Sequence, residues 1–274
     1  MKEPLPRGAD VDARRMRSWL DTFAGYRYAV NEARIDRWLA QFEAADRDLA
    51  ARILDSIDFI SAGQTTQAFR AVLGGLTGWS IDQAERQERW RFVALSASAG
   101  ESGDTMLHRF RLANNLSGKQ YKELFVYKRD LLQEKLGPDD VVVFVDDFAG
   151  TGHQVCEHWP ELAELLPGAP LVYLALVAAT HDAREKIEAE TRLAVIPYIE
   201  LTPQDNIFGD ACPHFTAEER QVLLRYCTVA SGRHPRGFGD SGLVAVLAHN
   251  CPNNSIPILH ASHPLWEGLF RRHD

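Results

Sequence analysis

The chain has 274 residues, of which 45% are hydrophobic and 25% charged, an ordinary globular composition with enough apolar material for a core. Its 30 basic and 38 acidic side chains give a formal net charge of −8. This acidic balance argues against nonspecific binding of nucleic acid, which needs many contacts between basic side chains and phosphates. The four cysteines form no Cys-x-x-Cys pair, so the sequence indicates neither a thiolate metal site nor a disulfide framework.

Membrane insertion and secretion are also not expected from the sequence. The longest apolar stretch, Leu171–Ala179, is too short to cross a bilayer as a helix and suits a buried strand. No apolar segment follows the charges of the first eight residues, as a secretory signal would require. We therefore expect a soluble, cytoplasmic protein.

Residues 1–89 are predicted to form an all-α N-terminal extension. Large apolar side chains recur there at helical spacing with polar residues between them, for example at Trp38, Leu39 and Phe42. Aromatic side chains at this spacing usually belong to a core, so we expect them to pack inward rather than to bind nucleic acid.

Residues 90–274 are predicted to form a separate α/β domain, in which strands and helices alternate. This alternation is typical of an open, mainly parallel sheet flanked by helices. The strand Val141–Val145 is fully apolar, as expected at the centre of such a sheet. The predicted strands are 91–95, 141–145, 171–177, 193–199 and 243–248, and the predicted helices are 104–113, 119–135, 154–166, one starting near 180 and one opened by a capping box at 216–219.

The end of the strand Val141–Val145 carries the clearest functional pattern. Asp146 and Asp147 follow it, and carboxylates at the end of so apolar a strand should meet solvent, a cation or hydroxyl groups. The small residues 149–152 then lead into a helix, whose first amides and dipole favour an anion. Acids for sugar hydroxyls beside amides for a phosphate predict a site for a ribose 5-phosphate. The alternative is an ordinary strand end followed by a tight glycine turn.

The stretch Val141–Gln154 resembles the signature of type I phosphoribosyltransferases, with an apolar strand, two acids, three residues, Thr-Gly and two more residues. The resemblance implies that Asp146 and Asp147 hold the ribose of phosphoribosyl pyrophosphate (PRPP) as catalytic residues, with Mg²⁺ bound beside them. The 5-phosphate loop that it implies consists of Ala149, Gly150, Thr151, Gly152, His153 and Gln154.

Two residues depart from the pattern of that family. Gln154 stands where Thr or Ser is usual, and Gly150 stands where purine-salvage members have a catalytic Asp. The second departure also occurs in active members, such as those that make orotidine monophosphate. It therefore argues against purine salvage and not against activity.

A second loop, residues 98–103, resembles the one that receives pyrophosphate in this fold. Its binding residues would be Ser98, Gly100, Ser102 and Gly103. The loop also contains Glu101, whose carboxylate repels pyrophosphate unless Mg²⁺ intervenes. Family members often have a basic residue there, and Arg109, Lys119 or Lys122 could supply one.

The C-terminal runs Gly237–Leu243 and His249–Leu259, together with Trp266, are similar to the phosphoribosyltransferase-like proteins of bacterial conflict systems. Those proteins are found in defence loci, including retron-type loci. The resemblance implies an anti-phage defence effector that acts on nucleotides, with a reverse transcriptase or a sensor as its protein partner. Within these runs, Asn250, Asn253 and Asn254 could order a loop over the ligand or simply form Asx turns.

Histidines outside the phosphate loop are not expected to carry chemistry. His181 and Asp182 are predicted in the first turn of a helix capped by Thr180. His249, His260 and His263 lack the spacing of metal ligands on a helix, which argues against zinc. His153 could donate to a phosphate or lie exposed on its helix.

Two functions stay open at this level. An enzyme would bind PRPP or a nucleotide with Mg²⁺ and transfer or cleave at the anomeric carbon, mainly through orientation and electrostatic stabilisation. A catalytically inactive module would use the same pocket to sense a nucleotide, or would only join a defence complex.

Overall fold

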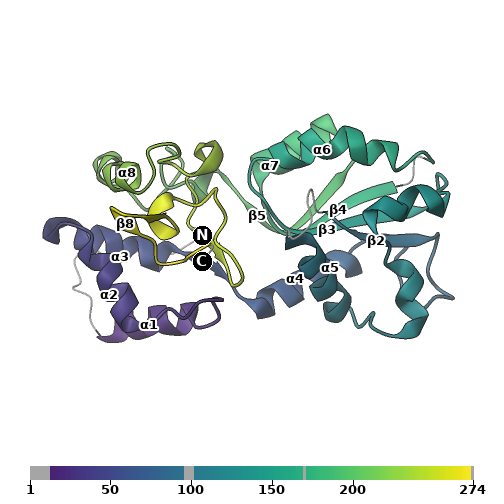
Figure 1. Ribbon diagram of the computed structural model, residues 1–274, viewed down its shortest axis with the longest axis horizontal. Helices are drawn as coiled ribbons and strands as arrows, with labels where there is room; N and C mark the ends of the chain where they lie inside the picture. Colours follow the sequence, from purple (N-terminus) through teal and green to yellow (C-terminus); the bar gives the residue numbers. More distant parts are fainter. Residues whose placement is uncertain (1–12, 96–101, 169–170, 273–274) are drawn as a thin grey trace. The chain divides into compact units, whose positions relative to one another are not determined.

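The computed structural model describes residues 13–95, 102–168 and 171–272 (Figure 1). The chain divides into two compact units: unit 1 comprises Met1–Ala62 and Thr202–Asp274, and unit 2 comprises Gly63–Leu201. This division differs from the predicted boundary at residue 89, because the N-terminal helices form one unit with the C-terminal segment.

Unit 2 is built on a four-stranded parallel sheet with the strand order β2-β3-β4-β5. Its strands are β2 (Trp90–Ala94), β3 (Val141–Ala149), β4 (Leu171–Thr180) and β5 (Ala194–Leu201). Residues Val141–Val145 are fully buried at the centre of the sheet, which confirms the α/β prediction for this segment. Because the strands are parallel, their C-terminal ends share one edge of the sheet.

Helices cover both faces of this sheet (Figure 1). On one face lie α6 (His153–Glu164) and α7 (His181–Glu190), whose Leu162 and Ile187 join the strand residue Phe144 in one buried cluster. On the other face lies α5 (Ser102–Ala113), next to α4 (Ala62–Gly74). The α/β architecture with helices flanking a parallel sheet is therefore confirmed.

The predicted helix 119–135 is wrong. Two short 3₁₀ helices, η2 (Lys119–Leu124) and η3 (Lys128–Glu134), occupy this segment. Between them, Phe125 forms a parallel bridge with Phe92 of β2, and the two rings lie 5.4 Å apart. Pairing with the sheet draws this residue out of a helical path, which a helical spacing of apolar residues cannot reveal.

Unit 1 combines helices with short strands. The expectation of an all-α N-terminal part is wrong at β1 (Asp58–Ile60), which pairs in parallel with β6 (Ala245–Leu247) from the C-terminal segment. β7 (Ser262–His263) and β8 (Trp266–Glu267) form an antiparallel pair. The elements of unit 1 are α1 (Ala13–Phe23), α2 (Glu32–Ala40), η1 (Ala44–Asp46), α3 (Arg47–Ser56), β1 (Asp58–Ile60), η4 (Pro203–Asp205), α8 (Ala217–Ala230), η5 (Phe238–Asp240), β6 (Ala245–Leu247), η6 (Pro257–Leu259), β7 (Ser262–His263) and β8 (Trp266–Glu267).

Aromatic side chains fill the core of unit 1, as their helical spacing predicts. Trp38 is buried, and its indole N–H donates to the carbonyl of Ile258 at 2.7 Å. Phe270 packs edge-on against Phe23, with the ring centroids 5.1 Å apart. The predicted capping box at the start of α8 is confirmed, since Thr216 and Glu219 cap each other's backbone amides.

In the part of the chain that the structure describes, no helix combines the length and the apolar character needed to span a bilayer.

Candidate functional site

The two predicted catalytic acids lie inside β3, which is four residues longer than predicted. Asp147 is buried, with 9% of its surface exposed, and Asp146 is half-buried. Asp146 lies opposite Leu176 of β4, and its carboxylate accepts a hydrogen bond from the Asp147 amide at 2.9 Å. The strand thus holds both acids near the C-terminal edge of the sheet. Ala149, predicted in the phosphate loop, is the last residue of the strand.

The turn after β3 leads directly into α6, which begins at His153, one residue before the predicted start. Gly152 is the N-cap of this helix and has a left-handed backbone, with φ of 68°. Since a glycine cap offers no side-chain acceptor, the helix opens without a side-chain cap. The amide of His153 lies 3.4 Å from the Thr151 hydroxyl, and the side chains of His153 and Gln154 are exposed.

Gly152 also has a structural reason to be glycine. A Cβ atom there would lie 2.9 Å from the Ala183 carbonyl oxygen and 3.0 Å from Cγ1 of Ile187, both on α7. The close approach of the turn to α7 and the positive φ both require glycine. This part of the motif is therefore needed for packing whether or not a ligand binds.

Thr180 ties the turn to the next strand. Its hydroxyl donates to the Gly150 carbonyl at 2.7 Å and accepts from the Ala183 amide at 3.0 Å. The second bond confirms the predicted N-cap of α7. The first bond was missed, because it joins residues 30 positions apart and has no local sequence signal.

An ionic cluster that the sequence analysis also missed lies at the same edge of the sheet. Glu200 of β5 is in register with Ala179 of β4. Its carboxylate contacts Nδ1 of His181 at 2.7 Å and accepts from Arg184 at 2.9 Å. The hydrogen bond that His181 donates to Glu200 raises the pKa of His181 and lowers the pKa of Glu200. The sequence signal was a carboxylate at a strand end, as for Asp146.

The predicted pyrophosphate loop is described only in part. Ser98 and Gly100 lie outside the described residues, and Ser102 and Gly103 are the first residues of α5 rather than loop residues. The amide of Leu95 donates to the Val145 carbonyl at 3.1 Å. The chain therefore leaves β2 beside Val145, four residues before β3 ends, and both strands run toward the same edge of the sheet.

The basic residues proposed to compensate for Glu101 lie on different elements. Arg109 lies on α5, while Lys119 and Lys122 lie on η2. Both elements belong to unit 2. Helix α5 also packs against β2 and β3, as its contacts with these strands show.

The acid pair alone does not complete the coordination of a magnesium ion, which would also need oxygen atoms from water and from the bound substrate. Among the described residues, no group of three or more His, Cys, Asp or Glu side chains could hold a metal. Mg²⁺ commonly takes one or two carboxylates and completes its octahedron with water and substrate phosphates. Asp146 and Asp147 match that donor set.

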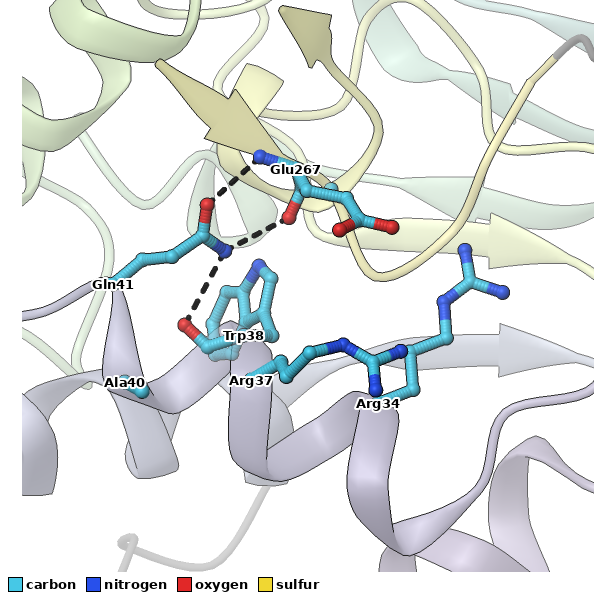
Figure 2. Close-up of a pocket in the computed structure, with 7 residues that line it drawn as sticks. Arg34, Arg37, Trp38, Ala40, Gln41 and Glu267 are labelled. Atoms are coloured by element: carbon cyan, nitrogen blue, oxygen red, sulfur yellow. Dashed lines mark hydrogen bonds between the residues drawn. The ribbon is translucent and has the colours of Figure 1, made fainter. Parts of the chain in front are cut away.

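Two pockets in the described residues lie away from β3. One, in unit 1, is drawn in Figure 2 and is lined by residues that include Arg34, Arg37 and Glu267. The other, in unit 2, is lined by residues that include Asp82, Arg86 and Tyr121. Neither lining contains a predicted site residue.

The C-terminal runs pack on each other within unit 1. The Asn254 amide donates to the Phe238 carbonyl at 3.0 Å and to the Ser241 hydroxyl at 3.1 Å. A Cβ atom on Gly237, whose φ is 80°, would lie 2.3 Å from the Asn254 carbonyl oxygen. The Asn254 side chain therefore ties the two runs together through bonds to residues 16 and 13 positions away, rather than through the Asx turn that the sequence suggested.

The comparisons with known proteins agree with this architecture. No curated protein and no solved structure gives a significant match. The family model described as PRTase-CE matches residues 35–272, which include the whole parallel sheet and the turn after β3. The chain therefore belongs to the PRTase-CE family and is a phosphoribosyltransferase-like protein.

Proposed function

We propose that the protein binds a ribose 5-phosphate compound, PRPP or a nucleotide, together with Mg²⁺ at the end of β3. The observation that carries the proposal is the order of groups along one sheet edge. Asp146 and Asp147 are followed by a glycine turn and then by α6, which opens without a side-chain cap. Helix N-termini with this geometry bind phosphate, and carboxylates suit sugar hydroxyls.

In this proposal, different residues bind different parts of the ligand. Asp146 and Asp147 hold the ribose hydroxyls and, with the phosphates of the ligand, the metal ion. The amides of Gly150–His153 hold the 5-phosphate. Thr180 supports them, because its bond to the Gly150 carbonyl fixes the turn. The segment after β2, which starts beside β3, receives the pyrophosphate.

The proposed activity is transfer or cleavage at the anomeric carbon. Such a reaction needs orientation and charge stabilisation rather than a dedicated nucleophile. The alternative is a catalytically inactive module that senses a nucleotide with the same groups or only joins a defence complex. The carboxylate of Glu101 in the predicted pyrophosphate loop favours this alternative.

The proposed setting is a bacterial anti-phage defence system with a reverse transcriptase or a sensor as partner. Its support is the similarity of Gly237–Leu243 and His249–Leu259 to conflict-system proteins. Membership of the PRTase-CE family is consistent with that similarity and supports the phosphoribosyltransferase-like character.

Calorimetry with PRPP and Mg²⁺ tests the binding site. We expect the wild-type protein to bind and Asp147→Asn to bind at least tenfold more weakly, because a charge-assisted contact is lost. Asp139→Asn is the matched control, since Asp139 is exposed in the turn before β3 and the change removes the same charge. Removal of Mg²⁺ with a chelator should weaken binding in the same way.

A pyrophosphate-release assay then separates the two functions. Release that depends on Asp147 supports the enzyme, whereas Asp147-dependent binding without turnover supports the sensor. If neither PRPP nor any nucleotide binds, or if Asp147→Asn binds as the wild type does, the proposed site is wrong.

A further inference from the structure

A pocket in unit 1 gathers more positive charge than its own residues neutralise. It encloses about 310 Å³ between α2 and β8 (Figure 2). Its lining consists of Arg34, Arg37, Trp38, Ala40, Gln41, Glu267 and Gly268. All seven residues belong to unit 1, so the pocket is separate from the proposed site on β3.

One wall of the pocket is fixed by backbone hydrogen bonds. The side chain of Gln41 accepts from the Glu267 amide at 2.8 Å and donates to the Glu267 carbonyl at 2.9 Å (Figure 2). A Cβ atom on Gly268 would lie 2.7 Å from the backbone of His260, so only glycine fits at this position. The pocket is therefore held open by a rigid frame, and the amide of Gln41 is already used.

The guanidinium of Arg34 has N–H donors that could bind a ligand. Its Nη1 donates to the Ala29 carbonyl at 3.3 Å. Its Nε and Nη2 are buried and, among the described residues, have no hydrogen-bond partner. Buried donors are nearly always paired, so two unpaired ones on a cation point to a ligand.

The surroundings of Arg34 are electropositive. Arg37 follows three residues later on α2, which places both side chains on one face of the helix. Burial first, and then the positive charge of Arg271, lowers the pKa of Arg34, and Arg37 adds to this effect. Glu267 opposes it but is engaged by Arg271, whose Nη2 donates to its carboxylate at 2.8 Å. One carboxylate therefore faces three guanidinium groups.

We propose that this pocket binds a small molecule through an oxyanion, either a phosphate or a carboxylate. The planar fork of a guanidinium matches both groups in a bidentate geometry. Arg34 donates to the oxyanion from inside the pocket and Arg37 from its exposed rim, while Trp38 and Gly268 contribute contact surface. The volume lies at the lower end of the range for small-molecule sites. This inference does not depend on the proposed function of β3.

Calorimetry on the full chain without Mg²⁺ tests the pocket, with inorganic phosphate, pyrophosphate and citrate as separate probes. We expect at least one probe to bind and Arg34→Gln to weaken that binding tenfold or more. Arg37→Gln, a change at an exposed position, should weaken it less. Arg17→Gln removes the same charge at an exposed position of α1 and should have no effect. The comparison of phosphate with citrate decides which oxyanion the pocket prefers.

The Asp147→Asn variant separates this site from the one on β3. Binding of the probe should be unchanged in Asp147→Asn and weakened tenfold or more in Arg34→Gln, with both variants shown to be folded by circular dichroism. The proposal is overturned if no probe binds, or if Arg34→Gln and Arg37→Gln bind every probe as tightly as Arg17→Gln does.

Discussion

Unit 2 and unit 1 differ in how far along the chain their contacts reach. The strands of unit 2 neighbour each other in the order in which they occur in the sequence. Unit 1 joins the two ends of the chain: Trp38 bonds to a carbonyl 220 residues away, and Tyr26 to one 245 residues away. Local patterns of hydrophobicity therefore predict most of unit 2. In unit 1 they predict the helices, but not which segments of the chain pack together.

The largest expected change in stability tests whether the C-terminal tail, residues 262–272, is part of the core of unit 1. Phe270 is fully buried and packs edge-on against Phe23 and Tyr26. Phe270→Ala should lower the free energy of unfolding by about 3–5 kcal/mol, because it leaves a large cavity. Leu265→Ala, in the same tail, should have almost no effect, since Leu265 is 71% exposed. Denaturant unfolding measures both, and equal losses would contradict a core that includes the tail.

The next effect tests close packing in unit 2. Gly152→Ala should cost about 2–4 kcal/mol, because it forces a left-handed backbone on alanine and a contact with α7. Gly74→Ala, at the end of α4, is the matched control, since nothing lies within 4 Å of its added Cβ atom. Thermal unfolding without ligand compares the two variants. A neutral Gly152→Ala would mean that the turn does not approach α7 as described.

A smaller effect tests the link between the turn and β4. Thr180→Val removes the hydroxyl that caps α7 and bonds to the Gly150 carbonyl, and should cost about 1–2 kcal/mol. Thr180→Ser keeps the hydroxyl and should retain most of the wild-type stability. If serine is no better than valine, the methyl group of Thr180 and not its hydroxyl is the important part.

The smallest effect concerns the ionic cluster at the sheet edge. NMR titration should show a pKa of His181 above the ordinary value, and Glu200→Gln should lower it. Glu161→Gln, an exposed change on α6, should leave it unaltered. A His181 pKa that does not respond to Glu200→Gln would contradict the contact.

The sign of the pH dependence follows from these shifts. The raised pKa of His181 stabilises the fold below the ordinary histidine value of about 6.5, and this contribution is lost as the pH rises through the raised pKa. The lowered pKa of Glu200 stabilises the fold above its ordinary value, and this contribution is lost as the pH falls through the lowered pKa. The pair therefore contributes most between these two ordinary values, and only modestly, because both side chains are partly exposed.

Much of the candidate site could be predicted from local residues. An apolar strand, two acids and a glycine turn before a helix stand next to each other in sequence, so β3 and α6 were located to within a few residues. The bond from Thr180 to Gly150 and the cluster around Glu200 could not be predicted, since both depend on strand register. The Arg34 pocket depends on the pairing of α2 with the C-terminal tail, which no local pattern indicates.

The sequence by itself determined most of the helices and strands of unit 2 and the position of the glycine turn after β3. Hydrophobic periodicity and glycine act over a few residues, and no distant contact is needed to express them. Only the tertiary structure decided that Gly152 must fit against α7, that η2 and η3 replace one helix, and that the N-terminal helices share a core with the C-terminal segment. These outcomes rest on contacts between residues far apart in the chain, and such contacts are set by packing and register rather than by local preference.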